Sequence, residues 1–151
     1  LLGAGVVGEH VVLAGPVGPE VDGVADPLRV EVVTPVLRLR PLDALVVARS
    51  PFIPGSVVRA RPIAVLMLED EAGGDEKLLT VPVDTTFPYY ADVMVRQDLP
   101  SIVMQQIEHF FTHYKDLEAE KWVRVGHWGG AEEARRIVME AIERAKVGAA
   151  A

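Results

Sequence analysis

The chain has 151 residues, the length of one domain or of one domain with an attached arm. Half of the residues are hydrophobic and 25% are charged, which is typical of a folded domain rather than a disordered one. The 22 acidic residues outnumber the 15 basic ones, and the net charge of −7 argues against a nucleic-acid partner. No apolar run approaches the roughly 20 residues of a membrane-spanning helix. There is no cysteine for disulfides or thiolate metal sites. We therefore expect a soluble, cytoplasmic domain that contacts no membrane.

The first 40 residues have an unusual composition. They use only ten amino-acid types, are rich in Val, Gly and Pro, and contain no aromatic residue. Because large apolar side chains are scarce, we expect this arm to be irregular and to bury little volume of its own. Ordinary composition begins at Pro41. The sequence thus predicts an atypical arm over residues 1–40 and a folded domain over residues 41–151.

Three strands are predicted in the first half of that domain. Leu42–Ala48 is an apolar run of strand length, and Val57–Glu69 alternates charged with apolar residues. Pro62 should interrupt the hydrogen bonding of the second strand or place it at an edge. A third strand is predicted at Lys77–Val83, so the acidic, glycine-containing loop 70–75 joins two strands of a hairpin.

Two helices are predicted after these strands. The first has an apolar stripe at helical spacing, formed by Val103, Ile107, Phe110, Tyr114 and Leu117. A short strand at Trp122–Val125 precedes the second helix, which begins after Gly129-Gly130. Strands first and helices last favour an α+β fold with a small mixed or barrel-like sheet.

The carboxylates of the acidic loop are candidate ligands for a hard cation. Asp70 and Asp75 flank two glycines that allow both side chains to turn toward one point. Oxygen ligands without His or Cys favour Mg²⁺ or Mn²⁺ over zinc. The alternative is a solvated hairpin tip, and a third carboxylate nearby would favour the metal. Asp43, which lies between apolar residues of the first strand, is the natural candidate; its own alternative is a solvated strand face.

The end of the first helix carries candidate anion-binding groups. Lys115 can offset the charge of an oxyanion, and the Tyr114 hydroxyl can donate to the same group. The alternative is structural, because Tyr114 lies on the predicted stripe and a lysine suits the negative end of a helix dipole. His109 and His113 are four residues apart, a spacing that can hold zinc, but no third ligand accompanies them.

Four separated segments, taken together, resemble soluble family I inorganic pyrophosphatase. They stand in the family's order and spacing between about Pro41 and Lys146, and they are Pro41–Val46, Met67–Lys77, His109–Glu118 and Lys121–Val125. The resemblance implies an oligonucleotide-binding-like (OB-like) mixed β-barrel flanked by two C-terminal helices. It also implies Mg²⁺-dependent hydrolysis of inorganic diphosphate to two phosphates by a homo-oligomer, usually a hexamer.

The resemblance further implies roles for individual residues. Metal binding and catalysis fall to Asp43, Asp70 and Asp75, and substrate binding falls to Lys77, Tyr114 and Lys115. These roles agree with elementary electrostatics. Diphosphate is a polyanion, so an acidic pocket can bind it only after divalent cations invert the local charge.

The chain departs from the family signature Asp-x-Asp-Pro-x-Asp just before Asp43. Arg38 replaces a metal ligand, and Arg40 replaces the carboxylate that helps to deprotonate the attacking water. Because guanidinium groups neither bind metals nor accept protons, we expect severely reduced activity. The alternative is a catalytically inactive relative that serves as an assembly or anion-binding subunit. A slipped reading frame upstream of Pro41 would explain both arginines and the composition of residues 1–40; a divergent arm is the other explanation.

Overall fold

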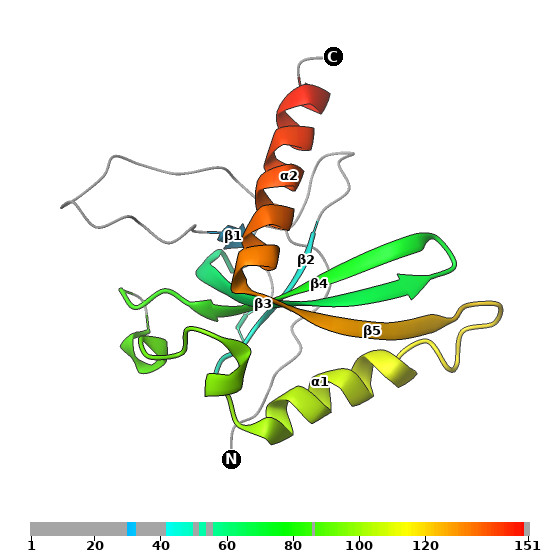
Figure 1. Cartoon of the computed structure of the whole chain (residues 1–151), viewed down its shortest axis with the longest axis horizontal. Coiled ribbons are helices and arrows are strands. Elements are labelled where there is room, and N and C mark those ends of the chain that lie inside the picture. Colours follow the sequence, from blue (N-terminus) through cyan, green and yellow to red (C-terminus); the bar gives the residue numbers. More distant parts are fainter. Residues whose placement is uncertain (1–29, 33–41, 50–51, 54–55, 86, 150–151) are drawn as a thin grey trace.

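The structure, a computed structural model, describes residues 30–32, 42–49, 52–53, 56–85 and 87–149. Arg38 and Arg40 lie outside the described residues, as does almost all of the predicted arm. The strands are β1 (Val30–Val32), β2 (Asp43–Val46), β3 (Val58–Asp70), β4 (Gly73–Pro82) and β5 (Val123–Gly130). The helices are η1 (Pro88–Tyr90), η2 (Arg96–Asp98), α1 (Ser101–His113) and α2 (Ala131–Ala149) (Figure 1). Neither described α-helix combines the length and the apolar character needed to cross a bilayer.

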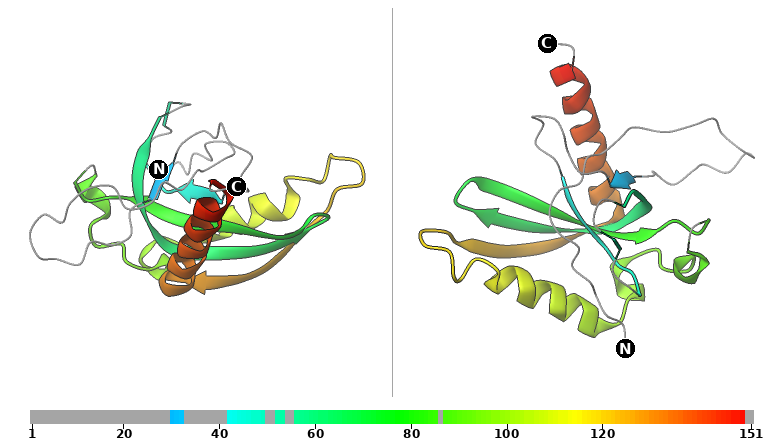
Figure 2. Two further views of the ribbon diagram at one scale, coloured as in Figure 1. Left: turned by 90° about the horizontal axis from the view of Figure 1, so that it is seen from above. Right: turned by 180° about the vertical axis from the view of Figure 1, so that it is seen from behind.

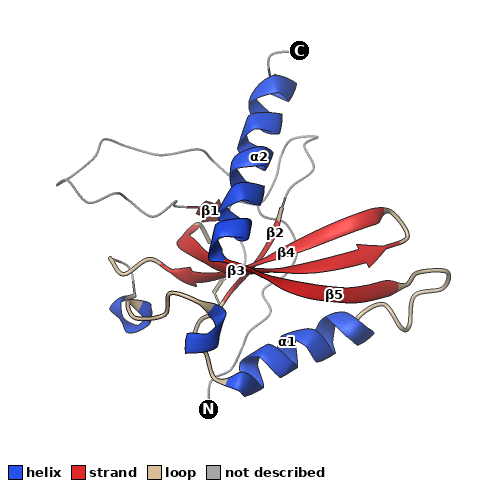
Figure 3. Cartoon of the chain, in the orientation of Figure 1, coloured by secondary structure: helices blue, strands red, loops and turns tan. Residues whose placement is uncertain are grey.

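The strands form one mixed sheet around β3. Strand β4 pairs with β3 in antiparallel fashion along one edge, and β1 and β5 pair with different parts of its other edge. Strand β2 adds to β4 in parallel. The predicted α+β fold with an OB-like mixed sheet is confirmed, and its described strands form an open sheet (Figure 3). The predicted hairpin is confirmed as β3 and β4.

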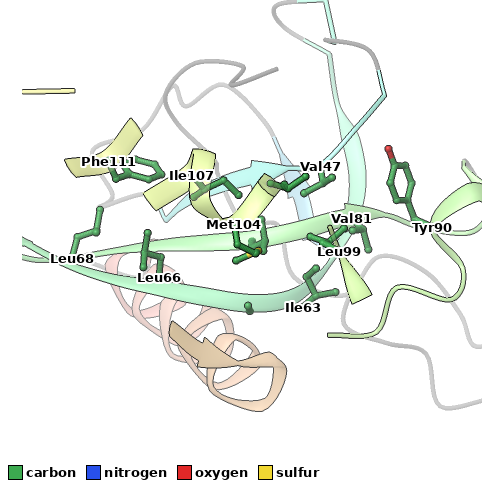
Figure 4. Packing of buried hydrophobic residues seen from close by; sticks show 13 residues of the cluster. Val47, Ile63, Leu66, Leu68, Val81, Tyr90, Leu99, Met104, Ile107 and Phe111 are labelled. Atoms are coloured by element: carbon green, nitrogen blue, oxygen red, sulfur yellow. The ribbon is translucent and has the colours of Figure 1, made fainter. Parts of the chain in front are cut away.

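Side-chain alternation divides the core between the two faces of the sheet. In β3, Ala64, Leu66 and Leu68 pack on the α1 side, whereas Val65 and Met67 pack on the α2 side. Helix α1 contributes Val103, Met104, Ile107 and Phe111 to the first cluster (Figure 4). Helix α2 contributes Ala134, Ile137, Val138 and Ile142 to the second. The sheet is therefore the middle layer between two helices, as Figure 2 shows from two sides.

A β-bulge in β3 sets which residues face α1. The register of β3 against β4 shifts between Pro62 and Ala64, as expected for a proline within a strand. Ile63 and Ala64 are adjacent in sequence, yet both join the cluster beneath α1. The bulge thus moves the alternation by one residue, so that Asp70 at the end of β3, and not Glu69, falls on the α1 side.

Helix α1 ends earlier than the sequence predicts, and its stripe follows a different register. It ends at His113, and Leu117 is fully exposed instead of belonging to the stripe. Phe111 is 5% exposed, whereas Phe110 is 39% exposed. The predicted stripe is therefore wrong at Phe110 and Leu117. Because two phenylalanines are adjacent, either one can belong to the apolar stripe of the helix. Packing against the sheet buries Phe111 and leaves Phe110 exposed.

The β3–β4 turn is tighter than predicted. Strand β3 runs to Asp70 and β4 begins at Gly73, so Glu71 and Ala72 alone form the turn. Gly73 has a φ of 115°, a backbone conformation that favours glycine. Asp75 consequently lies within β4 and not in a loop.

Arg61 fixes the segment between β4 and α1 to the sheet. Its guanidinium donates to the carbonyl oxygens of Val93 at 2.5 Å and of Tyr90 at 2.6 Å. The residue is only 6% exposed, so these bonds satisfy donors that are shielded from water.

We expect Arg61→Met to lower the free energy of unfolding by about 3 kcal/mol, because a buried carbonyl of Tyr90 and a partly buried carbonyl of Val93 lose a charged donor. Chemical denaturation of both proteins measures this difference. Arg135→Met is the matched control, since Arg135 makes a surface ion pair with Glu132 and its loss should cost less than about 1 kcal/mol. Equal losses in the two variants would contradict the role given to Arg61.

Candidate active site

Four charged side chains of the sheet share the face that α1 covers. Asp70 follows Leu68 by two residues in β3, and Lys77 precedes Leu79 by two residues in β4. Asp75 lies two residues before Lys77 in β4, so the two side chains lie on the same face of the sheet. Asp43 is the first residue of β2 and pairs with Lys77. Strand geometry therefore gathers residues that are far apart in the sequence on one surface.

Lys77 forms the first ion-pair cluster. The parallel pairing of β2 with β4 places Asp43 opposite Lys77, and the ammonium donates to Asp43 Oδ2. It also donates to Asp75 Oδ1 at 2.7 Å. Burial alone would lower the pKa of the Lys77 ammonium, but the hydrogen bonds to Asp43 and Asp75 outweigh burial and raise it above 10.5. Lys77 is therefore charged at neutral pH although it is only 8% exposed.

Lys115 forms the second cluster, in the turn that follows α1. Its ammonium donates to Asp70 Oδ2 at 2.7 Å and to both oxygens of Glu71 at 3.3 Å. Burial opposes the charge of Lys115, but the hydrogen bonds to Asp70 and Glu71 raise its pKa well above the usual range. The bond from Lys115 is also the main reason why the pKa of Asp70 lies below its ordinary value of 3.8. Asp70 Oδ1 accepts the backbone N–H of Ala72 at 2.8 Å, so this carboxylate also closes the turn.

The two clusters lie within electrostatic reach of each other. Lys77 contributes to the low pKa of Asp70, although Lys115 is the main cause. Burial raises the pKa of the Tyr114 hydroxyl, and the charges of Lys115, Lys77 and Asp75 also act on it. The structure thus brings together all six residues singled out by the sequence, while their catalytic and binding roles stay predictions.

The donor set suits a hard divalent cation in both chemistry and charge. Carboxylate oxygens are the ligands that Mg²⁺ prefers. Four carboxylates, those of Asp43, Asp70, Glu71 and Asp75, surround two ammonium groups, which leaves two negative charges. Among the described residues, however, no three acidic or histidine side chains form a ready group of ligands. An ammonium bridges each pair of carboxylates, so a cation would have to take the place of such a contact.

The histidine pair does not extend this site. The rings of His109 and His113 lie 4.7 Å apart, and His113 Nδ1 is 2.9 Å from Asp116 Oδ2 at the exposed end of α1. Within the part of the chain that the structure describes, these residues make no group of three metal ligands.

Sequence reasoning missed the contact that Glu71 makes. Glu71 was only a member of the acidic loop in the sequence, whereas in the structure both of its oxygens reach Lys115. Its position directly after Asp70 is the one signal in the sequence. Predicting the contact with Lys115 from that position would require knowing the length of the turn and the residue at which α1 ends. Tertiary packing sets both.

We expect Lys77→Met to lower the free energy of unfolding by about 3 kcal/mol, because it leaves two partly buried carboxylates without their counter-charge. Denaturation at neutral pH measures the loss. Lys121→Met is the control, since Lys121 pairs with Glu118 on the surface and its loss should cost less than about 1 kcal/mol. A cost for Lys77→Met as small as that of the control would contradict the structure.

Acid should destabilise the protein through Asp70. Because folding lowers the pKa of Asp70, its stabilising contribution is complete above 3.8 and is lost as the pH falls through the lower value of the folded state. Lys115→Met removes the main cause, so this variant should lose less stability than the wild-type chain between about pH 5 and about pH 2. Denaturation curves across that range test the difference. Identical pH slopes in the two proteins would show that Lys115 does not hold the Asp70 carboxylate.

Comparison with known proteins identifies the family. A family model described as inorganic pyrophosphatase matches residues 40–146. An inorganic pyrophosphatase of Bradyrhizobium diazoefficiens is 51% identical over 106 residues, which cover 70% of this chain and 60% of the relative. The inorganic pyrophosphatase of Xanthomonas campestris is 53% identical over 104 residues, which cover 69% of this chain and 58% of the relative. A solved structure of an inorganic phosphatase from Anaplasma phagocytophilum is 45% identical, with a TM-score of 0.69 over 71% of this chain and 63% of that one. The chain spans about 60% of the length of the curated relatives it matches, and it belongs to the inorganic pyrophosphatase family.

Proposed function

We propose that this chain hydrolyses inorganic diphosphate to two phosphates with Mg²⁺, for which Mn²⁺ can substitute. The names of its relatives support the reaction, and one observation in the structure supports the site. Two buried ammonium groups, Lys77 and Lys115, lie on one face of the sheet among four carboxylates. That combination suits a ligand made of a divalent cation and a polyanion together.

In this proposal Asp43, Asp70 and Asp75 hold the cation, which, when bound, polarises phosphoryl oxygens and makes a water more acidic. Lys77 and Lys115 bind phosphoryl oxygens and offset the negative charge that develops as the bridging oxygen leaves. Both ammonium groups are suited to this role because their raised pKa values keep them charged.

Tyr114 complements the two lysines as a neutral donor. Burial raises the pKa of its hydroxyl above 10.0, so the proton is retained at neutral pH. A protonated hydroxyl donates a hydrogen bond to a phosphoryl oxygen and adds no negative charge to an already acidic site. We assign Tyr114 to the same phosphate as its neighbour Lys115.

The proposal includes an impairment of this activity. Arg38 and Arg40 stand where the family signature has carboxylates, so the chain lacks a metal ligand and a group that accepts the proton of the attacking water. Both residues lie outside the described part of the structure, and the sequence alone supports this point. A homo-oligomer, a hexamer by resemblance, and a cytoplasmic location belong to the same proposal.

A second candidate function is a catalytically inactive subunit that binds anions or supports assembly. The arginine pair favours it, because two guanidinium groups a few residues before Asp43 in the sequence are donors that bind phosphate without any metal.

Phosphate release from diphosphate with Mg²⁺ tests the proposal. We expect a low rate for the chain as it stands and a rise of about 100-fold or more in the double variant Arg38→Asp with Arg40→Asp. Adding Lys115→Met to that variant should abolish the gain. Full activity in the unaltered chain would refute the interpretation of the two arginines.

The same proteins distinguish the second candidate. If the double variant stays inactive and the unaltered chain binds orthophosphate equally tightly with and without Mg²⁺, the anion-binding subunit is the better description. If the double variant is active and Mg²⁺ tightens the binding of orthophosphate to the unaltered chain, the enzyme is the better description.

A further inference from the structure

Two carboxylates of different character hold the Lys115 ammonium. Asp70 is the closer partner at 2.7 Å, and its side chain is 14% exposed. Glu71 reaches the same ammonium with both oxygens at 3.3 Å, and its side chain is 36% exposed. Lys115 lies in the turn after α1, and its ammonium donates hydrogen bonds to these two carboxylates.

Glu71 is itself attached to the segment that carries Lys115. The backbone N–H of Trp122 donates to Glu71 Oε2 at 3.4 Å, close to where β5 begins. Glu71 lies in the turn between β3 and β4, so its carboxylate joins this hairpin to the connection between α1 and β5. Hydrogen bonds, first from its own backbone and then from Lys115 and Trp122, lower the Glu71 pKa below 4.5, and the group is ionised at neutral pH.

The proposed function places competing demands on Asp70. A divalent cation beside this carboxylate neutralises its charge and repels the ammonium of Lys115. Among the described residues, Glu71 is then the carboxylate that still lies within hydrogen-bond reach of Lys115.

We propose that Glu71 is a positioning residue, which holds the Lys115 ammonium at the phosphate site while Asp70 binds a cation. This inference rests on the proposed function and adds one residue to it. Glu71 acts through Lys115 and touches neither the cation nor the phosphate. The effect of Glu71 on phosphate binding is therefore conditional. It is small while no cation is bound at Asp70 and large when a cation is bound there.

Binding of orthophosphate to the full chain, measured by calorimetry with and without Mg²⁺, tests this conditional effect. With Mg²⁺, Glu71→Gln should raise the Kd for orthophosphate by about tenfold, the effect of losing one charged hydrogen bond. Without Mg²⁺ the rise should stay below about threefold, because Asp70 still holds Lys115. A merely structural role for Glu71 would weaken binding equally in both conditions, and that result, or no weakening in either, would overturn the inference.

Glu118→Gln is the matched control. It removes the same charge from the connection between α1 and β5, where Glu118 pairs with Lys121 and not with Lys115. The orthophosphate Kd of this variant should change by less than about twofold with or without Mg²⁺. A tenfold rise with Mg²⁺ in the control as well would assign the effect to net charge and overturn the role of Glu71.

A second measurement needs neither ligand. Asp70→Asn removes the charge of Asp70, as a bound cation would neutralise it. In that background Glu71→Gln should lower the Tm by about 3 °C more than it does in the wild-type background. An equal or smaller shift would overturn the inference. A wild-type chain that binds neither Mg²⁺ nor orthophosphate would instead refute the proposed function. The unfolding comparison would still decide whether Glu71 holds the Lys115 ammonium when Asp70 has lost its charge.

Discussion

Burying an ammonium group against an apolar layer is the physical constraint on which the rest of this structure depends. Lys77 directly precedes the buried Leu78 and Leu79 of β4, and it stays charged there because Asp43 and Asp75 accept hydrogen bonds from its ammonium group. The contact with Asp43 spans β2 and β4, so one ion pair joins strands as well as side chains. The charged groups that would bind a substrate therefore also stabilise the sheet. A ligand that displaces one of these ion pairs must supply an equivalent interaction to the groups it separates.

The same constraint explains why the site lies at one end of the α1 face. The period of two along each strand selects the face, and the bulge at Pro62 adjusts that period so that Asp70 joins it. Helix α1 then ends beside these carboxylates, where the negative end of its dipole and the turn after His113 present Lys115. No single element holds the site. Two strands of a hairpin, a parallel neighbour and a helix end each supply part of it.

Much of this arrangement could be predicted from the sequence, and the exceptions have physical reasons. Alternation predicts the long strand and its hairpin, and the separated motifs name the charged residues that the structure gathers. Phe110 and Phe111 show the limit, because adjacent aromatic residues fit two helical registers and only packing into the cluster between α1 and the sheet distinguishes them. Glu71 shows another limit, since its contact with Lys115, 44 positions later in the chain, depends on a two-residue turn meeting the turn that follows α1.

The balance of charge connects the arginine pair to this geometry. The four carboxylates exceed the two ammonium groups by two negative charges, which suits a divalent cation. In the family signature, two further carboxylates stand just before Asp43 and would deepen that excess. Arg38 and Arg40 carry positive charges at these two positions of the sequence instead. If they approach Asp43 as the signature residues do, the protein alone becomes neutral there, and the electrostatic reason to recruit a cation disappears. Phosphate then meets lysine and guanidinium donors without a metal between them. In that case the two arginines change which ions the site attracts, in addition to the loss of a ligand and a base that we propose.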